Sequence, residues 1–280
     1  MANVQKIIKT AAYDSIKKMR SFRFISAVMM VVGLVLAVTS GMDQLIGDVN
    51  EKVSIWIVPH IFSNTFFAAF YGIIICYLLS DIPYFNANEL YYISRMGRKK
   101  WFMEKMLSMI LSMFMFTIIS FAVCVLVFVP KINFTMEWGK VIHTMAYSTN
   151  LYSYNLMNLV SPSILMNYKP ITAMETCFLM VGCVMFAISI WFNRTVSIVV
   201  VLMLSLLGLS EGLFFTQRWL PFLSIFTWYR ISVYGETIFM DWQYPKQYVY
   251  VILIICIMCL SFFAAYRRIR HTEFDWINET

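Results

Sequence analysis

Six long apolar runs divide this chain and restrict the environment in which it can fold. They cover residues Phe24–Thr39, Ile57–Leu79, Leu107–Val129, Ile171–Phe192, Val196–Phe214 and Tyr248–Tyr266. A helix needs about 20 apolar residues to cross the hydrocarbon core of a bilayer. The sequence is 60% hydrophobic and only 13% charged, whereas soluble domains contain about 25% charged residues. We therefore predict an all-α, polytopic membrane protein with six transmembrane helices, in which residues 1–280 form a single transmembrane domain.

The 22 lysines and arginines are distributed unevenly between the two sides of this arrangement. Six spans place both termini on one side, and that side then carries fifteen of the 22 basic residues, against seven on the other. An excess of Lys and Arg is typical of cytoplasmic loops. The sequence therefore predicts a multi-pass protein of the plasma membrane with both termini in the cytoplasm. The same basic loops explain the net charge of +7, so we do not expect nucleic acid as a partner.

Residues 1–22 have the pattern of an amphipathic helix. Between Asn3 and Arg20 the apolar residues fall on one helical face, and Lys6, Lys9 and Lys17 fall on the other. Such a helix is typical of the membrane interface. The alternative is a soluble helix that packs on a partner protein.

The basic segment 81–105, between the second and third apolar runs, predicts a short helix with both ends marked. Asn86 is a suitable N-cap, and Glu89 is three residues later, as in a capping box. Gly97 is a natural residue to follow the last turn. The segment contains an apolar stripe of Leu90, Ile93 and Met96 and the basic residues Arg95, Arg98, Lys99, Lys100 and Lys105. We interpret it as a docking element for a cytoplasmic partner; the alternative is an ordinary basic loop.

Two long connections complete the chain. Residues 131–170 are polar and aromatic, and we expect an extracellular connection with short helices or strands over the outer mouth of the bundle. Residues 215–247 are rich in aromatic residues and interrupted by Pro221, Gly235 and Pro245. This composition predicts interfacial or re-entrant helices before the last span.

Motifs for catalysis are missing from the sequence. There is no phosphate-binding loop of the G-x-x-x-x-G-K-[ST] type, so this chain is not expected to hydrolyse ATP by itself. The three histidines, His60, His143 and His271, are far apart, which disfavours a metal site. Cys256 and Cys259 form a C-x-x-C pattern inside an apolar run, and we interpret them as packing residues. We expect no catalytic residue, no metal site and no cofactor bound by this chain.

Two carboxylates are close to the outer ends of apolar runs. Glu211 precedes Gly212 at the end of the fifth run, and Glu175 lies near the start of the fourth. A carboxylate within the membrane indicates a functional site by default. The alternative is a hydrated or hydrogen-bonded Glu at the interface.

With these features the chain resembles the membrane (permease) subunit of an ABC exporter of the type 2 export class. The resemblance rests on the amphipathic N-terminal helix, the six runs and the series Glu89, Arg95, Gly97, Arg98 and Lys105. It implies that the loop after the second span forms a coupling helix that docks on an ATPase subunit. The residues implied in ATPase coupling are Glu89, Leu90, Tyr91, Tyr92, Ile93, Arg95, Met96, Gly97, Arg98 and Lys105. It further implies an outer gate or cargo path at Glu211 and Gly212.

The resemblance also implies partners. These are an ABC ATPase subunit that binds ATP and Mg²⁺, a second permease copy or a sister permease, and the lipid membrane. The cargo would be hydrophobic or amphipathic, such as a peptide, a lipid or a drug. The alternatives are a secondary transporter, a membrane-bound enzyme and a non-transporting membrane partner such as an immunity protein. The basic loop after the second span has no counterpart after the fifth, which disfavours the inverted repeat of many secondary transporters.

Overall fold

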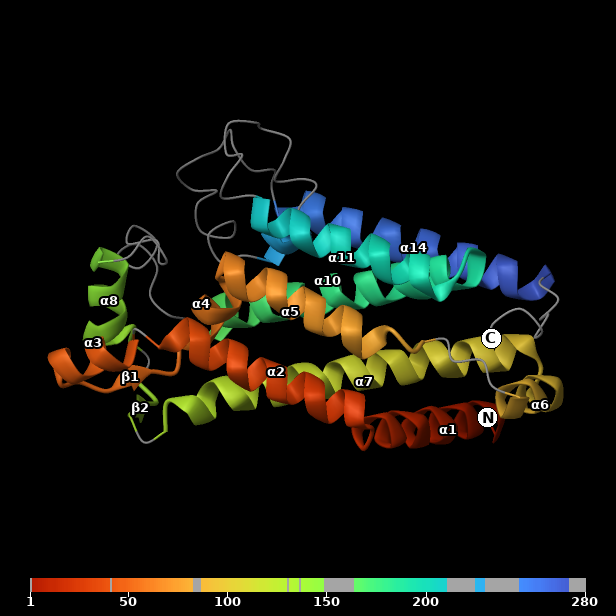
Figure 1. Ribbon diagram of the computed structural model, residues 1–280, viewed down its shortest axis with the longest axis horizontal. Coiled ribbons are helices and arrows are strands. Elements are labelled where there is room, and N and C mark those ends of the chain that lie inside the picture. Colours follow the sequence, from red (N-terminus) through yellow and green to blue (C-terminus); the bar gives the residue numbers. More distant parts are fainter. Residues whose placement is uncertain are drawn as a thin grey trace.

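The computed structural model describes residues 2–40, 42–82, 87–129, 131–135, 137–148, 164–210, 225–229 and 247–271. This part of the chain is mostly helical, and the long helices run along the longest axis of the molecule (Figure 1). Lengthwise helices are α2 (Phe22–Thr39), α5 (Thr65–Leu79), α7 (Arg98–Val127), α10 (Ile164–Trp191), α11 (Arg194–Ser210) and α14 (Gln247–His271). By length and composition α2, α7, α10 and α14 can cross a membrane, whereas the apolar parts of α5 and α11 are shorter. The chain is therefore a helical membrane protein, as its apolar runs predict.

Helix α10 occupies the middle of the bundle and contacts α5, α7, α11 and α14. Its candidate span is also the most buried of the four. Gly182 of α10 explains part of this close packing. A Cβ atom at this position would lie 3.1 Å from both Leu79 Cδ1 of α5 and Met109 Sδ of α7. The small residue thus lets α10 approach two neighbouring helices closely, as small residues do in membrane bundles.

The second apolar run forms two helices instead of one. Helix α4 (Ile57–Ser63) ends at Asn64, and α5 begins at Thr65. Asn64 has extended backbone angles (φ −65°, ψ 131°), and its side-chain oxygen accepts hydrogen bonds from the Phe66 and Phe67 N–H groups at 2.9 and 3.2 Å. This side-chain cap satisfies N–H groups that a new helix leaves free at its start. A polar N-cap inside an apolar run therefore divides the expected span.

Short elements gather at the end of the bundle opposite α6 (Ala87–Met96) (Figure 1). They are α3 (Met42–Val49), β1 (Val53–Ser54), β2 (Ile132–Asn133) and α8 (Gly139–Ser148). β1 and β2 pair in parallel, with Val53 opposite Ile132. The Trp56 indole N–H also donates to the Thr135 carbonyl at 2.9 Å. The all-α expectation thus needs a correction, because a two-stranded sheet joins segments that are about 80 residues apart in the sequence.

The expected connections differ from the structure in their extent. Helix α10 begins at Ile164, so part of the connection expected over 131–170 belongs to a long helix. Within 131–148 the structure contains β2 and α8, in agreement with the short elements expected there. Of the expected re-entrant segment 215–247, only the 3₁₀ helix η1 (Ile225–Tyr229) is described, and it packs against α10 and α11. Glu211 and Gly212 lie outside the described residues.

Candidate functional site

Helix α6 is a short helix at the end of the bundle where α1 (Ala2–Met19) also lies (Figure 1). Gly97 separates it from α7 and has a φ of +85°, a region that favours glycine. The Gly97 N–H donates to the Ile93 carbonyl at 2.8 Å and closes the last turn. The stop that the sequence predicts at Gly97 is therefore confirmed. The expected N-cap, Asn86, lies outside the described residues.

Glu89 of α6 joins three elements of the bundle through its carboxylate. Its Oε2 atom accepts a hydrogen bond from the Trp101 indole N–H at 2.9 Å, and its Oε1 atom lies 2.8 Å from Lys105 Nζ. Lys105 also pairs with Asp14 of α1 at 2.7 Å. We expected Glu89 to cap its own helix or to pair with a partner protein. Instead, both of its oxygens bond to α7, because Trp101 and Lys105 present donors at successive turns of that helix.

Tyr92 forms a second connection between α6 and α7. Its hydroxyl donates to Glu104 Oε2 at 2.8 Å. Burial, reinforced by this bond to a carboxylate, raises the pKa of Tyr92 to about 12. Ile93 is only 5% exposed and belongs to the hydrophobic core of the chain. The expectation that Tyr92 and Ile93 anchor a partner is thus corrected: both side chains stabilise the chain's own packing.

The outward face of α6 presents a different set of residues. Tyr91 is 69% exposed and Arg95 is also exposed, whereas Met96 is half-buried. Of Leu90 only the helical backbone is described. Arg98, the first residue of α7, donates from Nη1 to the Arg270 carbonyl at 3.1 Å, which connects α7 to the end of α14. The predicted coupling residues therefore divide into an inner set that anchors α6 and an outer set that a partner can reach.

The inner partners Asp14, Trp101 and Glu104 were not among the residues predicted from the sequence. The available signal was weak: Asp14 is the one acidic residue in the basic helix α1, and Glu104 interrupts the beginning of an apolar helix. We name the group Asp14, Glu89, Trp101 and Lys105 the α6 anchor.

A second ion-pair group connects α1 and α2 to the end of α5. Lys18 Nζ lies 3.1 Å from Asp81 Oδ1, and Arg23 Nη1 lies 3.8 Å from Asp81 Oδ2. Arg23 also donates to Ser80 Oγ at 3.2 Å. Burial lowers the pKa of Lys18, and the nearby Asp81 carboxylate opposes this effect. A cavity of about 460 Å³ with charges of both signs lies between this group and the α6 anchor.

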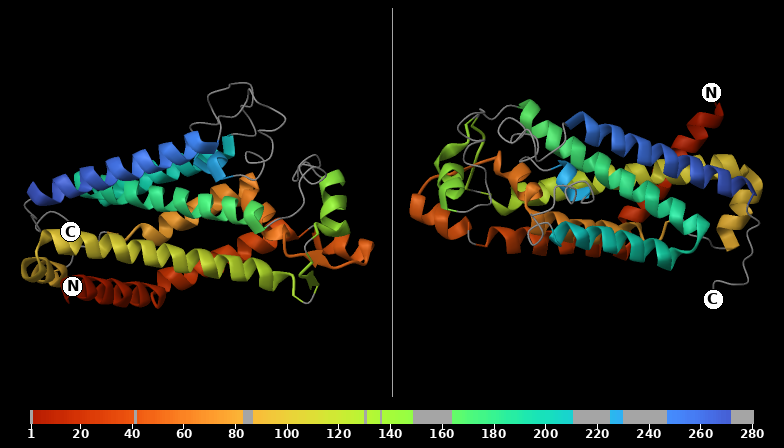
Figure 2. Two further views of the ribbon diagram at one scale, coloured as in Figure 1. Left: turned by 180° about the vertical axis from the view of Figure 1, so that it is seen from behind. Right: turned by 90° about the horizontal axis from the view of Figure 1, so that it is seen from above.

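Helix α1 presents a buried face and an exposed face. Ala11 and Ser15 are buried, on the side that packs against α7. Ile8 and Ile16 are each 50% exposed, and Lys6, Lys9 and Lys17 are exposed as well. Figure 2 shows α1 running obliquely to the long helices in the view from above. This arrangement is typical of an amphipathic helix at a membrane interface.

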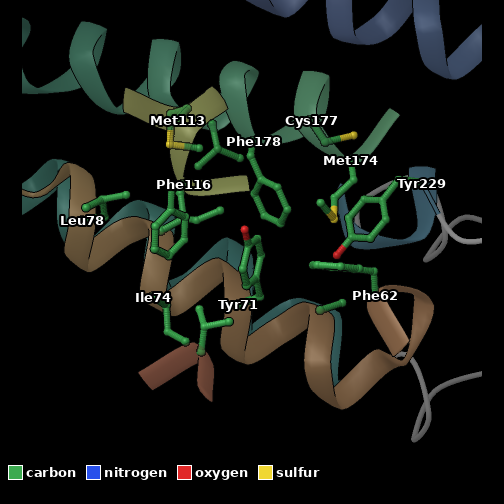
Figure 3. Close-up of a cluster of buried hydrophobic side chains, with 14 of the residues drawn as sticks. Phe62, Tyr71, Ile74, Leu78, Met113, Phe116, Met174, Cys177, Phe178 and Tyr229 are labelled. Atoms are coloured by element: carbon green, nitrogen blue, oxygen red, sulfur yellow. The ribbon is translucent and has the colours of Figure 1, made fainter. Parts of the chain in front are cut away.

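One carboxylate lies within the bundle, far from the α6 anchor. Glu175 of α10 accepts a hydrogen bond at Oε2 from the Thr117 hydroxyl of α7, while its buried Oε1 atom has no hydrogen-bond partner. Next to this pair, the Tyr71 hydroxyl donates to Ser120 Oγ at 3.0 Å. Figure 3 shows Tyr71 among Phe116, Phe178 and other apolar side chains. The bundle thus contains a small polar group in an apolar environment, to which α5, α7 and α10 contribute.

The described residues contain no group of three or more His, Cys, Asp or Glu side chains that could hold a metal ion. All six cysteines are free; Cys256 and Cys259 are exposed on α14. In the part of the chain that the structure describes, the polar groups open to a functional interpretation are the α6 anchor, the ion pairs at Asp81 and the Glu175 group.

Comparison of the chain with protein-family models, with curated proteins and with solved structures finds no match. The class that the fold defines is that of a helical membrane protein.

Proposed function

We propose that this chain is the permease subunit of an ATP-driven ABC exporter that moves a hydrophobic or amphipathic cargo out of the cell. It would cross the plasma membrane six times, through α2, α5, α7, α10, α11 and α14, with both termini in the cytoplasm. Residues 215–247 would re-enter the membrane from outside, next to an outer gate at Glu211 and Gly212. The chain would assemble with a second permease copy or a sister permease and with ABC ATPase subunits that bind ATP and Mg²⁺.

The observation that carries this proposal is the two-sided construction of α6. Its inner residues Glu89, Tyr92 and Ile93 hold it against the bundle, and its outer residues Tyr91 and Arg95 are exposed. A helix fixed on one face and open on the other is suited to transmit the movement of a bound partner. Exposed Tyr and Arg side chains are also the residue types that dominate protein interfaces.

The arrangement of α7 suggests how such a movement would reach the outer end. α7 has 30 residues, which corresponds to about 45 Å at about 1.5 Å per residue. Three of its residues, Trp101, Glu104 and Lys105, bond to α6 near the N-terminal end of α7, which would lie in the cytoplasm. A displacement of α6 would therefore tilt α7, which is long enough to cross the membrane. The tilt would change access to the path between the helices.

The test is a photo-activated cross-linking residue at position 91 in living cells, with position 13 as the matched control. Tyr91 and Tyr13 are both 69% exposed, and both lie at the same end of the bundle. We expect position 91 to capture an ATPase that carries a phosphate-binding loop, and position 13 not to capture it. Capture of other proteins alone, or equal capture of the ATPase at both positions, would contradict the proposal.

A second experiment separates assembly from coupling in the reconstituted complex. The outer variant Tyr91→Ala with Arg95→Ala should reduce co-purification of the ATPase about tenfold or more, because exposed anchors are lost. The inner variant Glu89→Gln should retain the ATPase but lower cargo-stimulated ATP hydrolysis and export. If both variants transport at the wild-type rate, α6 is not the coupling element.

The Glu175 group favours a second candidate, an ion-coupled secondary transporter. A carboxylate within the membrane is costly and is often part of a proton or ion pathway. The two candidates differ in their energy source: export from proteoliposomes would need ATP and the ATPase in the first case, and a proton or cation gradient alone in the second.

A further inference from the structure

We propose that the cavity between α1 and α6 binds the phosphate group of an anionic phospholipid from the cytoplasmic leaflet. The cavity has a volume of about 470 Å³, within the usual range of about 300–1,000 Å³ for small-molecule sites. This proposal goes beyond transport, because it needs only a membrane-embedded chain.

Three cations face this cavity from three different helices. They are Lys6 of α1, Arg95 of α6 and Lys100 of α7. Within the described part of the chain, none of these side chains takes part in an ion pair or hydrogen bond. Three like charges around one cavity repel one another, and a bound anion would convert this repulsion into attraction.

The neighbouring carboxylates do not pair with these cations. Asp14 and Glu89 both pair with Lys105, and Glu104 accepts the Tyr92 hydroxyl. Among the described residues no acidic side chain lines the cavity, and Thr10, Tyr91 and Tyr92 line it beside the cations. The acidic residues nearby thus bond to other groups, and the three lining cations give the cavity wall a positive charge that suits a phosphate.

The membrane is the best source of that phosphate. Helix α1 exposes the apolar side chains of Ile8 and Ile16 together with several lysines, a combination that suits a helix at the bilayer surface. The cavity is formed in part by this same helix, so in a membrane it would lie at the depth of lipid headgroups. Anionic lipids concentrate in the cytoplasmic leaflet, and basic residues near the surface attract them.

The experiment measures lipid binding to the purified full chain without any partner protein. Dodecylmaltoside-solubilised protein is titrated with phosphatidylglycerol, with phosphatidylcholine and with soluble glycerol 3-phosphate, and binding is followed by native mass spectrometry and by thermal stabilisation. We expect saturable binding of phosphatidylglycerol, and neither phosphatidylcholine nor glycerol 3-phosphate should stabilise at the same concentration. Equal binding of both lipids would overturn the site, and equal binding of glycerol 3-phosphate would overturn the lipid as its source.

Matched variants separate a defined pocket from diffuse surface charge. Lys6→Gln with Lys100→Gln removes two cations that line the cavity, and Lys9→Gln with Lys99→Gln removes two exposed cations from the same two helices that do not. We expect the first pair to weaken phosphatidylglycerol binding about tenfold to thirtyfold, from about 1 kcal/mol for each basic residue near an anionic surface, and the second pair by less than twofold. All four substitutions are at exposed positions, and the melting temperature without lipid verifies folding. Equal losses in the two pairs would refute a defined site.

The lipid-binding test is independent of the proposed transport function. Arg95 stays unchanged in both variants, because it also belongs to the outer face of α6. If the lipid site holds and position 91 captures no ATPase, only the transport proposal fails. If the ATPase binds and the paired variants do not differ, only the lipid site fails.

Discussion

Lys105 and Glu89 form an ion pair of 2.8 Å that joins the start of the longest helix, α7, to the helix that precedes it. Their side chains are only 14% and 23% exposed, respectively. The same Lys105 ammonium pairs with Asp14 at 2.7 Å, so one cation holds three segments together. Removal of the Glu89 charge takes away partly buried hydrogen bonds from Lys105 and Trp101 and leaves Lys105 paired with Asp14 alone, which costs more than the loss of an exposed pair.

Glu89→Gln should therefore lower the free energy of unfolding by about 1.5–3 kcal/mol, the usual range for hydrogen bonds to charged groups. The matched control is Glu51→Gln, which breaks an exposed pair. In that pair the Lys140 side chain is 77% exposed and the Glu51 side chain is 48% exposed. Exposed pairs contribute about 0.2–1 kcal/mol. Thermal unfolding in detergent measures both, and an equal effect of the two variants would contradict the anchoring role of Glu89.

Tyr92 should make the stability of α6 sensitive to alkaline pH. The folded-state pKa is about 12, above the unfolded value of 10.0. The contribution of Tyr92 is thus fully present below pH 10 and is lost as the pH rises from about 10 towards 12. We expect the wild type to be more stable than Tyr92→Phe at pH 8 and this advantage to shrink between pH 9.5 and 11. If the stability difference between wild type and Tyr92→Phe does not change with pH, then folding does not raise the pKa of Tyr92.

The Glu175 group should respond differently to an amide and to an apolar residue. Glu175→Gln retains an acceptor for Thr117 and removes any charge from the bundle, so we expect an unchanged or higher melting temperature. Glu175→Ala leaves a cavity and an unpaired hydroxyl, and we expect a loss of about 1–3 kcal/mol. A marked loss of stability in Glu175→Gln would indicate that the fold needs the carboxylate itself.

Gly182→Val should disturb the packing at the centre of the bundle. Its Cβ would approach Leu79 and Met109 to 3.1 Å, and overpacking of this kind typically costs about 1–3 kcal/mol. Gly33 of α2 provides a matched control, because nothing lies within 4 Å of the corresponding position. We expect Gly33→Val to change the melting temperature little. Similar losses in both variants would assign the effect to helix propensity and not to contact.

The proposed topology predicts opposite accessibility of the two ends. Asp48 of α3 and Lys99 of α7 are both exposed and lie at opposite ends of the bundle. In intact cells a membrane-impermeant maleimide should label Asp48→Cys and should label Lys99→Cys only after permeabilisation. The unsubstituted chain gives the background from its own cysteines. Labelling of both positions from outside would exclude cytoplasmic termini with six spans.

Several features of this protein depend on local sequence alone. The apolar runs require a membrane, and the stop at Gly97 requires only that one residue adopt a positive φ. The amphipathic pattern of residues 3–20 likewise predicts the helix α1. These features follow from residues within a few positions of one another, because helical periodicity and chain termination are local properties.

Other features were decided only by the tertiary structure. Glu89 bonds to Trp101 and Lys105, and Ile93 is buried in the chain's own core, although their spacing equally suited a partner protein. The pairing of β1 with β2 and the contact of Lys105 with Asp14 join segments about 80–90 residues apart. No periodic pattern encodes which distant group a charged side chain will meet. The pairing depends on how the helices pack, because a half-buried charge is stable only next to a counter-charge, and packing decides which residues become neighbours.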